Sequence, residues 1–241
     1  MTRRVLVTGG GTGIGKAIAQ AFAAQKCQVT ISGRRRDALE QAAAGTGLEI
    51  RPADVTDEAQ VEALFDTPYD VVVANAGTGT AARIEDVELA DWQRTLTVNM
   101  TGTFLTFRAA LRAGMKPGGR LIAIASTASL QGGAHIPAYA ASKHGVLGLV
   151  RSVAQSVAKR GITCNAVCPG FVDTEMAETA ITGLMDRQGI SRDKALKMVV
   201  GGNPMQRLIT PEEVAATAVF LASEGAASVN GHAMSVSGGE V

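Results

Sequence analysis

The sequence has little net charge, few cysteines and no long apolar run. Its 241 residues carry a formal net charge of +1, and its basic residues are scattered apart from Arg34–Arg36, so a broad surface for nucleic acid is not expected. The three cysteines, at positions 27, 164 and 168, are an odd number without paired zinc-ligand spacing. No apolar run reaches the roughly 18 residues of a membrane span, and no signal-peptide pattern precedes the first apolar segment. These absences predict a soluble cytoplasmic protein without disulfides, with no nucleic-acid partner and no membrane contact.

The sequence does contain a regular alternation of apolar segments and helical patterns. Hydrophobic residues make up 46% of the chain, which is enough for one compact domain with a sizeable core. The apolar segments are 4–10, 27–33, 48–55, 69–77, 118–126, 161–170 and 231–239, and the helical patterns are 14–26, 36–44, 57–65, 89–113, 138–160 and one that begins at Pro211. Strands rich in Val, Ile and Ala on both faces suit a parallel sheet covered by helices on each side. We therefore predict a single-domain α/β fold, a Rossmann-type doubly wound parallel sheet whose ligand crevice lies at the carboxyl ends of the strands.

The segment 176–204 interrupts this alternation. It is polar, contains several glycines and has only weak helical periodicity at "DKALKMVV". A connection this long inside a compact domain is usually a lid or a binding loop, and a surface excursion without function is the alternative. The prediction is one domain spanning 1–241, with a substrate lid at about 176–204.

The first apolar segment ends in a glycine-rich loop that opens the first predicted helix. "TGGGTGIG" places Gly9, Gly13 and Gly15 there. Glycines at these places allow a tight turn and a close backbone approach, while the free N–H groups of the helix start suit a pyrophosphate. A glycine-rich loop alone is a weak signal, but its strand–turn–helix context predicts nucleotide binding.

The second apolar segment ends in "ISGRRRD", which bears on the choice of dinucleotide. A carboxylate at this place would hold the adenosine ribose hydroxyls, but Gly33 occupies it and Arg34 follows at once. A guanidinium is suited to a 2′-phosphate, and no acid is present to repel one. A solvated basic turn is the alternative interpretation. NADP(H) is therefore the favoured cofactor, and NAD(H) stays open.

One of the two tyrosines lies in "PAYAASKHG", four positions before a lysine. Residues four apart share a helix face, so Lys143 can approach the ring of Tyr139. An ordinary tyrosine has a pKa of about 10, and a nearby cation lowers it. Together with the charge of an oxidised nicotinamide, Lys143 is expected to bring the phenol toward the working range of a proton donor. Because this spacing is common by chance, a half-buried aromatic beside a solvated lysine is the alternative.

Taken together, the motifs make this sequence similar to the short-chain dehydrogenase/reductase family over essentially its full length. "TGGGTGIG" matches the family's Thr-Gly-x-x-x-Gly-x-Gly, and "ADV", "ANAG", "VNMTG", "IAIAS", "YAASK" and "CPGFVDT" follow in the family's order. Ser126 precedes Tyr139 by the family's usual interval. Two departures are present: Ala74 replaces the more usual first asparagine of "ANAG", and the stretch between Asp54 and Asp70 is shorter than usual, so a trimmed helix is expected there.

The resemblance implies a role for each member of a catalytic set. Tyr139 would donate a proton to the carbonyl oxygen during reduction and remove it during oxidation, and Lys143 would also bind the nicotinamide ribose. Ser126 would donate a hydrogen bond to the substrate oxygen, with Thr127 and Ser129 as close competitors.

Two further sets follow from the resemblance. The backbone of Asn99, inside the long predicted helix, would position a water of the proton relay, whereas a local kink is its alternative. Asp54 would contact the adenine ring, and Thr174 the nicotinamide carboxamide. The expected catalytic residues are Asn99, Ser126, Tyr139 and Lys143, and the expected cofactor-binding residues are Gly9, Thr12, Gly13, Ile14, Gly15, Arg34, Asp54, Val55, Asn75, Ala76, Gly77, Tyr139, Lys143, Pro169, Gly170, Val172 and Thr174.

The implied reaction is a reversible hydride transfer between a nicotinamide and a secondary alcohol or ketone, with no metal. The tail from Asn203 to Glu240 is similar to that of 3-oxoacyl-thioester reductases and 3-hydroxyacyl-CoA dehydrogenases, which favours a thioester of CoA or of an acyl carrier. The alternatives are another small ketone or alcohol, such as a sugar, a steroid or a cyclic alcohol, and a non-catalytic dinucleotide-sensing regulator. Retention of Tyr139 and Lys143 argues against the regulator. A homotetramer is expected from the resemblance alone.

Overall fold

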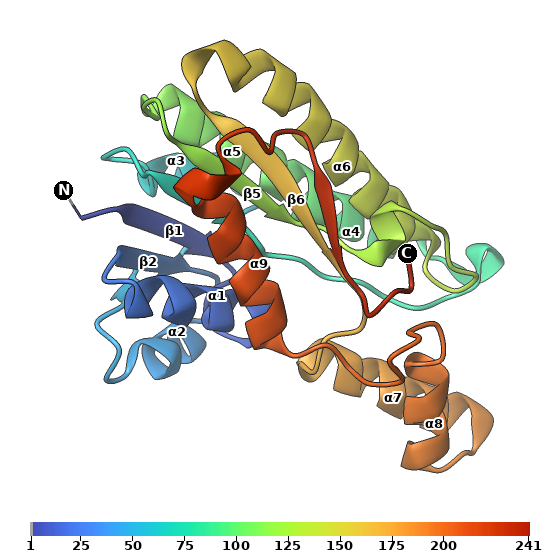
Figure 1. The fold of residues 1–241 in the computed structure, drawn as a ribbon. Coiled ribbons are helices and arrows are strands. Elements are labelled where there is room, and N and C mark those ends of the chain that lie inside the picture. The colour runs from blue at the N-terminus through green and yellow to red at the C-terminus, as the bar shows by residue number, and fades with distance from the viewer. Residues whose placement is uncertain (1) are drawn as a thin grey trace.

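The fold has three layers, a seven-stranded sheet between two layers of helices (Figure 1). It was obtained as a computed structural model that describes residues 2–241. The strands are β1 (Arg4–Thr8), β2 (Gln28–Ser32), β3 (Glu49–Ile50), β4 (Val71–Ala74), β5 (Arg120–Ile124), β6 (Thr163–Pro169) and β7 (Ala233–Val236). Every neighbouring pair is parallel, in the order β3-β2-β1-β4-β5-β6-β7. The chain thus winds outward from β1 in both directions, which confirms the predicted doubly wound parallel sheet.

The helices cover both faces of this sheet. They are α1 (Gly13–Ala24), α2 (Arg36–Ala43), α3 (Glu58–Ala63), α4 (Leu89–Leu96), α5 (Gly102–Arg112), α6 (Pro137–Val157), α7 (Glu175–Gln188), α8 (Arg192–Val199) and α9 (Pro211–Ala222). Helices α1, α2 and α9 pack on one face, and α3, α4, α5 and α6 pack on the other. Among residues 2–241, no helix has both the length and the apolar character that crossing a bilayer requires.

Alternate side chains of the central strands belong to two separate cores. Leu6 and Val72 pack with Phe107 of α5 on one face, while Val5 of the same β1 packs with Phe22 of α1 on the other face. All of these side chains are fully buried. A strand that is buried on both faces needs apolar residues at consecutive positions, and this explains the continuous apolar segments of the sequence.

Two segments differ from the sequence prediction. The single helix expected over 89–113 is interrupted by a π-helical turn at Thr97–Thr101, which separates α4 from α5. The predicted lid at 176–204 is mostly helical, because α7 and α8 bury a small apolar cluster between them, formed by Ile181, Ala195 and Val199. The weak periodicity at "DKALKMVV" belongs to α8. The trimmed helix expected between Asp54 and Asp70 is the six-residue α3.

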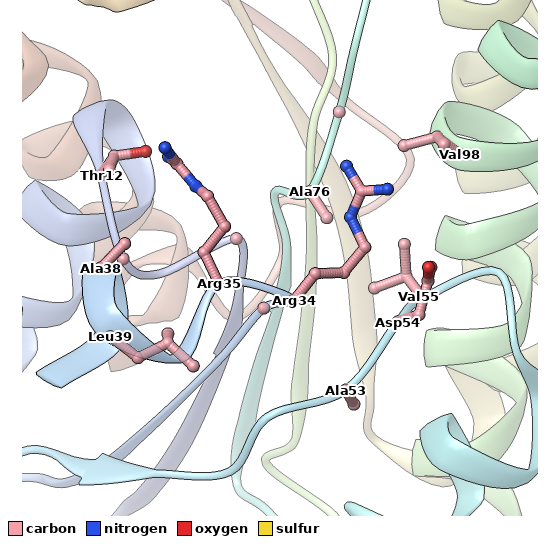
Figure 2. A pocket seen from close by; sticks show the side chains of 14 residues that line it. Thr12, Arg34, Arg35, Ala38, Leu39, Ala53, Asp54, Val55, Ala76 and Val98 are labelled. Atoms are coloured by element: carbon pink, nitrogen blue, oxygen red, sulfur yellow. The ribbon is translucent and has the colours of Figure 1, made fainter.

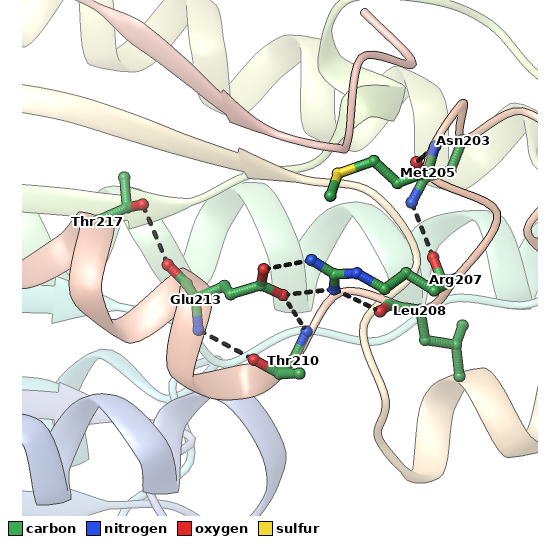
Figure 3. A network of polar contacts seen from close by, with 7 residues as sticks. All are labelled: Asn203, Met205, Arg207, Leu208, Thr210, Glu213 and Thr217. Carbon is green, nitrogen blue, oxygen red and sulfur yellow. Dashed lines mark hydrogen bonds and ion pairs between the residues drawn. The ribbon is translucent and has the colours of Figure 1, made fainter.

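A polar network joins the end of the α7–α8 segment to the start of α9 (Figure 3). The Thr210 hydroxyl accepts a hydrogen bond from the backbone N–H of Glu213 at 3.3 Å, and the Glu213 carboxylate accepts one from the Thr210 N–H at 2.8 Å. Two guanidinium nitrogens of Arg207 donate to the same carboxylate at 2.8 and 2.6 Å. These bonds, that of Arg207 above all, lower the pKa of Glu213 to about 2.

Replacing Glu213 by Gln should weaken the fold in a pH-dependent way. The pKa of Glu213 in the folded protein lies below the unfolded value of about 4.3, so its ionised form stabilises the fold above that value, and this contribution disappears as the pH falls toward about 2. We expect Glu213→Gln to lower the free energy of unfolding by about 1 kcal/mol at neutral pH, and by less as the pH falls. Urea unfolding at about pH 7 and about pH 3 measures both values, with Glu212→Gln in the same helical turn as the control. A deficit that is equal at both pH values would contradict the assignment.

Candidate active site

A hollow of ≈ 200 Å³ opens beside the carboxyl ends of β1, β2 and β4 (Figure 2). Its walls come from the loops that follow the first four strands, from α2 and from the turn at Thr97–Thr101. This edge of the sheet is where folds of this topology bind ligands. The lining residues are Gly9, Gly11, Thr12, Gly33, Arg34, Arg35, Ala38, Leu39, Ala53, Asp54, Val55, Ala76, Gly77 and Val98.

The glycine-rich loop packs tightly against the end of β4. Gly9 has a φ of +65°, and a Cβ added to it would lie 2.8 Å from Nδ2 of Asn75. A Cβ on Gly15 would overlap the carbonyl oxygen of Gly9. No side-chain cap covers the start of α1 at Thr12, so the first N–H groups of that helix remain available to an anion. This loop therefore fits the diphosphate of a dinucleotide.

Asn75 supports this loop from behind. Its Nδ2 donates hydrogen bonds to the carbonyl oxygens of Thr8 at 3.0 Å and Gly9 at 3.1 Å, and the Thr8 hydroxyl accepts from the N–H groups of Asn75 and Ala76. Asn75 does not line the hollow, although the sequence predicts it as a cofactor-binding residue. The structure gives its side chain a supporting contact with the loop.

Two consecutive arginines face the hollow. In Figure 2 the guanidinium of Arg34 extends toward Ala76 and Val98, and that of Arg35 extends toward Thr12. The third arginine of the run points elsewhere, because Arg36 pairs with Glu40 on α2 at 2.9 Å. Arg35 was not among the predicted site residues. The run of three arginines is its only signal in the sequence, and no sequence pattern says which of the three face the cavity.

Other predicted cofactor residues fall into two groups. Gly9, Thr12, Arg34, Asp54, Val55, Ala76 and Gly77 line the hollow. Ile14, Gly13, Gly15, Pro169, Gly170, Val172 and Thr174 do not line it. Thr174 nevertheless approaches the glycine-rich loop, since a Cβ on Gly13 would lie 3.1 Å from its Cγ2. Ile14 packs against the core on the α1 face.

Tyr139 and Lys143 occupy the first two turns of α6, next to the hollow. Lys143 is only 5% exposed, and its Nζ lies 5.6 Å from the centre of the Tyr139 ring. The same Nζ donates a hydrogen bond to the carbonyl oxygen of Ile124 at 2.8 Å, and it lies 3.7 Å from the position of a Cβ on Gly77. The amine is therefore located between the phenol ring and the lining of the hollow.

Burial changes the pKa of both groups. Desolvation lowers the pKa of Lys143 to about 8, because the buried ammonium loses its hydration. Desolvation raises the pKa of Tyr139, and hydrogen bonding to Ser126 opposes this increase. The side chains of the protein thus do not by themselves lower the pKa of Tyr139, contrary to the expectation from the Tyr–Lys spacing. The reason is that the sequence shows the neighbouring cation but does not show the loss of water around the phenol.

Ser126 follows the end of β5 and is nearly buried. Its hydroxyl accepts a hydrogen bond from the N–H of Ala128 at 3.1 Å and interacts with Tyr139. Thr127 and Ser129, the competing residues, are buried in the short helical turn that follows. The interaction with the phenol therefore favours Ser126 among the three.

Asn99 lies in the π-helical turn and is 1% exposed. Its Nδ2 donates to the carbonyl oxygen of Thr78 at 2.8 Å and to the hydroxyl of Ser142 at 2.9 Å, while its Oδ1 accepts from the Thr78 N–H at 2.8 Å. Ser142 in turn donates to the carbonyl oxygen of Tyr139 at 2.7 Å. The Asn99 side chain therefore ties the loop after β4 to the helix that carries Tyr139. The π-turn also accounts for the helix irregularity that the sequence suggested at this asparagine.

The loop after β4 also contacts the phenol directly. A Cβ on Gly79 would lie 2.7 Å from Cδ2 of Tyr139, so only glycine leaves room for the ring. Further along the same loop, the N–H of Ala82 donates to the carbonyl oxygen of His135 at 2.9 Å. Tyr139 is thus enclosed by two loops, and its ring is held from the side.

Comparison with known proteins agrees with this geometry. The family model described as enoyl-(acyl carrier protein) reductase matches residues 9–240. The chain is 36% identical over 253 residues to the D-β-hydroxybutyrate dehydrogenase of Cupriavidus necator, covering 99% of this chain and 98% of that protein. It is 35% identical over 246 residues to the 3-oxoacyl-(acyl-carrier-protein) reductase MabA of Mycobacterium tuberculosis, covering 99% and 93%. Its structure is similar to that of a variant of actinorhodin polyketide ketoreductase with NADPH, with a TM-score of 0.93, 33% identity, and 99% and 97% coverage.

The chain belongs to the short-chain dehydrogenase/reductase family. It is an NAD(P)-dependent oxidoreductase, and its reaction is a hydride transfer between a nicotinamide dinucleotide and a ketone or an alcohol. The glycine-rich loop, the free start of α1 and the hollow beside them fit such a dinucleotide.

Proposed function

We propose that the protein reduces 3-oxoacyl thioesters with NADPH and, in the reverse direction, oxidises 3-hydroxyacyl thioesters with NADP⁺. The observation that carries this proposal is the position of the Lys143 amine, between the Tyr139 ring and Gly77 of the hollow. The proton donor and the dinucleotide site are therefore adjacent. Such proximity is required if a hydride and a proton are to reach the same carbonyl group. The similarity to MabA, whose name states a 3-oxoacyl substrate, supports the substrate class.

Each end of the dinucleotide has residues suited to it. Arg34 would bind the 2′-phosphate, with Arg35 beside it, and the start of α1 would bind the diphosphate. Asp54 and Val55 would contact the adenine, and Thr174 the nicotinamide carboxamide. The remaining predicted residues would support these contacts, Asn75 from behind the loop and Pro169, Gly170 and Val172 from the end of β6. When bound, the cofactor supplies or accepts the hydride.

The chain's own residues would deliver the proton. The Tyr139 hydroxyl donates it to the carbonyl oxygen, and Ser126 donates a hydrogen bond to the same oxygen as negative charge develops there. Because burial raises the pKa of Tyr139, the phenol stays protonated at neutral pH, which suits reduction. Lys143, with its pKa at about 8, keeps most of its positive charge below that pH and stabilises the phenolate that forms. Asn99 holds the loop after β4 against α6, and its backbone would position a water that returns the proton.

The remaining properties are inferred in the same way. We propose a cytoplasmic homotetramer that needs no metal, in which the long helices α4–α5 and α6 of neighbouring copies pair across one interface, and the last strand β7 and its helix α9 pair across another. The exposed Phe104 on α5 and Phe220 on α9 support contacts on these faces. A non-catalytic dinucleotide sensor would not need the buried Lys143 amine beside a phenol, so the geometry favours an enzyme.

A panel of ketones assayed with NADPH and NADH in parallel tests the proposed function. We expect acetoacetyl thioesters to be reduced, with a kcat/KM at least about tenfold higher with NADPH than with NADH, because charge-assisted bonds to a phosphate contribute about 1.5–3 kcal/mol. Simple cyclic ketones, sugars and steroids complete the panel. Preferential reduction of one of these would replace the proposed substrate class, and a preference for NADH would overturn the cofactor assignment.

A further inference from the structure

One acidic side chain reaches an arginine of the hollow from the start of α7. Arg35 lines the hollow, and its Nη2 lies 3.7 Å from Oε2 of Glu175. Glu175 is the first residue of α7 and does not itself line the hollow. Within residues 2–241, Arg35 pairs with no other carboxylate. This ion pair therefore connects the loop after β2, which borders the dinucleotide site, with the α7–α8 segment.

Both partners of the pair are attached to segments that pack on the glycine-rich loop. Arg35 immediately precedes α2, and this helix packs on the loop, because a Cβ on Gly11 would lie 3.2 Å from its backbone. Glu175 follows Thr174, and a Cβ on Gly13 would lie 3.1 Å from the Cγ2 of that threonine. The ion pair thus lies beside the loop that fits the diphosphate of the dinucleotide.

The proposed phosphate sites are next to Arg35. Arg34, which would bind the 2′-phosphate, precedes it in the chain, and the Arg35 guanidinium extends toward Thr12 at the uncapped start of α1 (Figure 2). In the part of the chain that the structure describes, Arg34 forms no ion pair. The charge of Arg35, in contrast, is partly neutralised by Glu175.

The pair of Arg35 and Glu175 is weak enough for a phosphate to displace it. The two side chains are 61% and 78% exposed, and the distance between them exceeds that of a hydrogen bond. A phosphate monoester carries up to two negative charges and attracts a guanidinium more strongly than a single carboxylate does. The start of α7 also stabilises the negative charge of Glu175, so this carboxylate does not depend on Arg35. We therefore expect the guanidinium to turn from Glu175 to the 2′-phosphate when NADPH binds.

We propose that Glu175 is a specificity-determining residue, which competes with the 2′-phosphate of NADPH for Arg35 and so narrows the preference for NADPH over NADH. The inference rests on the proposed function, in which Arg34 binds that phosphate with Arg35 beside it. NADPH has to displace the ion pair and brings its own negative charge near an acid. NADH has no 2′-phosphate and leaves the pair intact. Specificity is a difference of two affinities, so a group that weakens one of them alone changes it.

The test measures the dissociation constants of NADPH and NADH for the full chain by isothermal titration calorimetry. Glu175→Gln retains the size of the side chain and removes its charge. We expect this variant to bind NADPH about two- to fivefold more tightly than wild type, which is the contribution of an exposed ion pair, and NADH with a change of less than about 1.5-fold. Glu178→Gln is the matched control. It makes the same change of net charge one turn further along α7, where Glu178 pairs with Arg192 at 2.8 Å, and it should leave the ratio of the two constants unchanged.

A double substitution shows whether Glu175 acts through Arg35. In an Arg35→Ala background no guanidinium is left to release, so adding Glu175→Gln should change the affinity for NADPH by less than about 1.5-fold. A merely structural role of Glu175 at the start of α7 would instead affect both dinucleotides, with or without Arg35. Salt screens exposed charges, so the gain in Glu175→Gln should shrink when the ionic strength is raised to about 0.5 M.

The outcomes distinguish this inference from the proposed function. If wild-type protein prefers NADPH and Glu175→Gln binds it no more tightly, the role of Glu175 is wrong while the proposed function stands. Weaker binding of both dinucleotides by Glu175→Gln would show that the ion pair holds the cofactor in place, and this too would overturn the competition. A gain that persists in the Arg35→Ala background would contradict the part played by Arg35. If wild-type protein binds NADH at least as tightly as NADPH, the cofactor assignment of the proposed function fails, and the inference fails with it.

Discussion

Tyr139→Phe should lower kcat for ketone reduction by about 10³-fold, while the affinity for NADPH stays within about twofold of wild type. General acid catalysis by a positioned side chain is worth roughly 10²–10⁴-fold, and the ring without its hydroxyl has no proton to donate. The ring itself should stay in place, because it packs against Gly79 and is half-buried at the start of α6. Steady-state kinetics with the acetoacetyl thioester and fluorescence titration with NADPH provide the two measurements.

The chain offers a matched control for this substitution. Tyr69, the other tyrosine, is buried in the core, where its ring packs against Phe65 with centroids 5.6 Å apart. Tyr69→Phe removes an equivalent hydroxyl far from the hollow and should leave kcat nearly unchanged. Undiminished ketone reduction by Tyr139→Phe, with NADPH binding intact, would show that the proton comes from another group and would remove the basis of the proposed mechanism.

The second large effect is expected at the cofactor site. Arg34→Ala should weaken NADPH binding by about 100-fold and NADH binding by less than about threefold. The guanidinium of Arg34 reaches across the hollow, and each charge-assisted bond to a phosphate contributes about 1.5–3 kcal/mol, that is, roughly 10–100-fold in affinity. NADH lacks the 2′-phosphate and loses none of these bonds. Isothermal titration calorimetry with both dinucleotides measures the two dissociation constants.

The neighbouring arginines serve as controls. Arg35 lies 3.7 Å from Glu175 and both side chains are mostly exposed, so its attraction to a phosphate is screened and Arg35→Ala should have a smaller effect than Arg34→Ala. Arg36 is paired with Glu40 on α2, away from the hollow, and Arg36→Ala should not change the preference for NADPH. Equal losses for NADPH and NADH in Arg34→Ala would place the guanidinium on another part of the dinucleotide.

The sequence predicted the sheet well because the information for it is local. Each strand buried on both faces leaves a continuous apolar segment, and each crossover helix leaves an amphipathic pattern between two such segments. Right-handed crossovers then favour a doubly wound sheet with helices on both faces. The motif of Tyr139 and Lys143 could also be found from the sequence, because residues four positions apart lie on the same face of a helix.

The features that the sequence did not predict depend on packing between distant segments. The contact of Glu240 with Gln131 joins residues 109 positions apart, and no local pattern indicates it. Nothing in the sequence distinguishes Arg35 from Arg36. Only the position at which α2 begins determines that Arg35 faces the hollow and Arg36 does not. The raised pKa of Tyr139 follows from loss of water around the hydroxyl, which only the surrounding loops determine. The motif assigns Asn75 to the site. Its supporting role could be recognised only from the structure, which shows that its side chain bonds to the carbonyl oxygen of Thr8.

The π-helical turn at Thr97–Thr101 contains one residue more than an α-helical turn, and this changes which surfaces α4 and α5 contact. Each residue of an α-helix rotates the chain by about 100°, so one additional residue shifts the phase of everything that follows. The segment before the turn directs its inner side to α6, and the segment after it faces β4 and α3. In an uninterrupted helix the apolar side chains would form a single stripe along the whole length. That stripe could pack against only one of these two surfaces. A single-residue deletion in this turn would therefore rotate the apolar stripe of α5 out of the core, and it would also displace Asn99 from its contacts with Thr78 and Ser142.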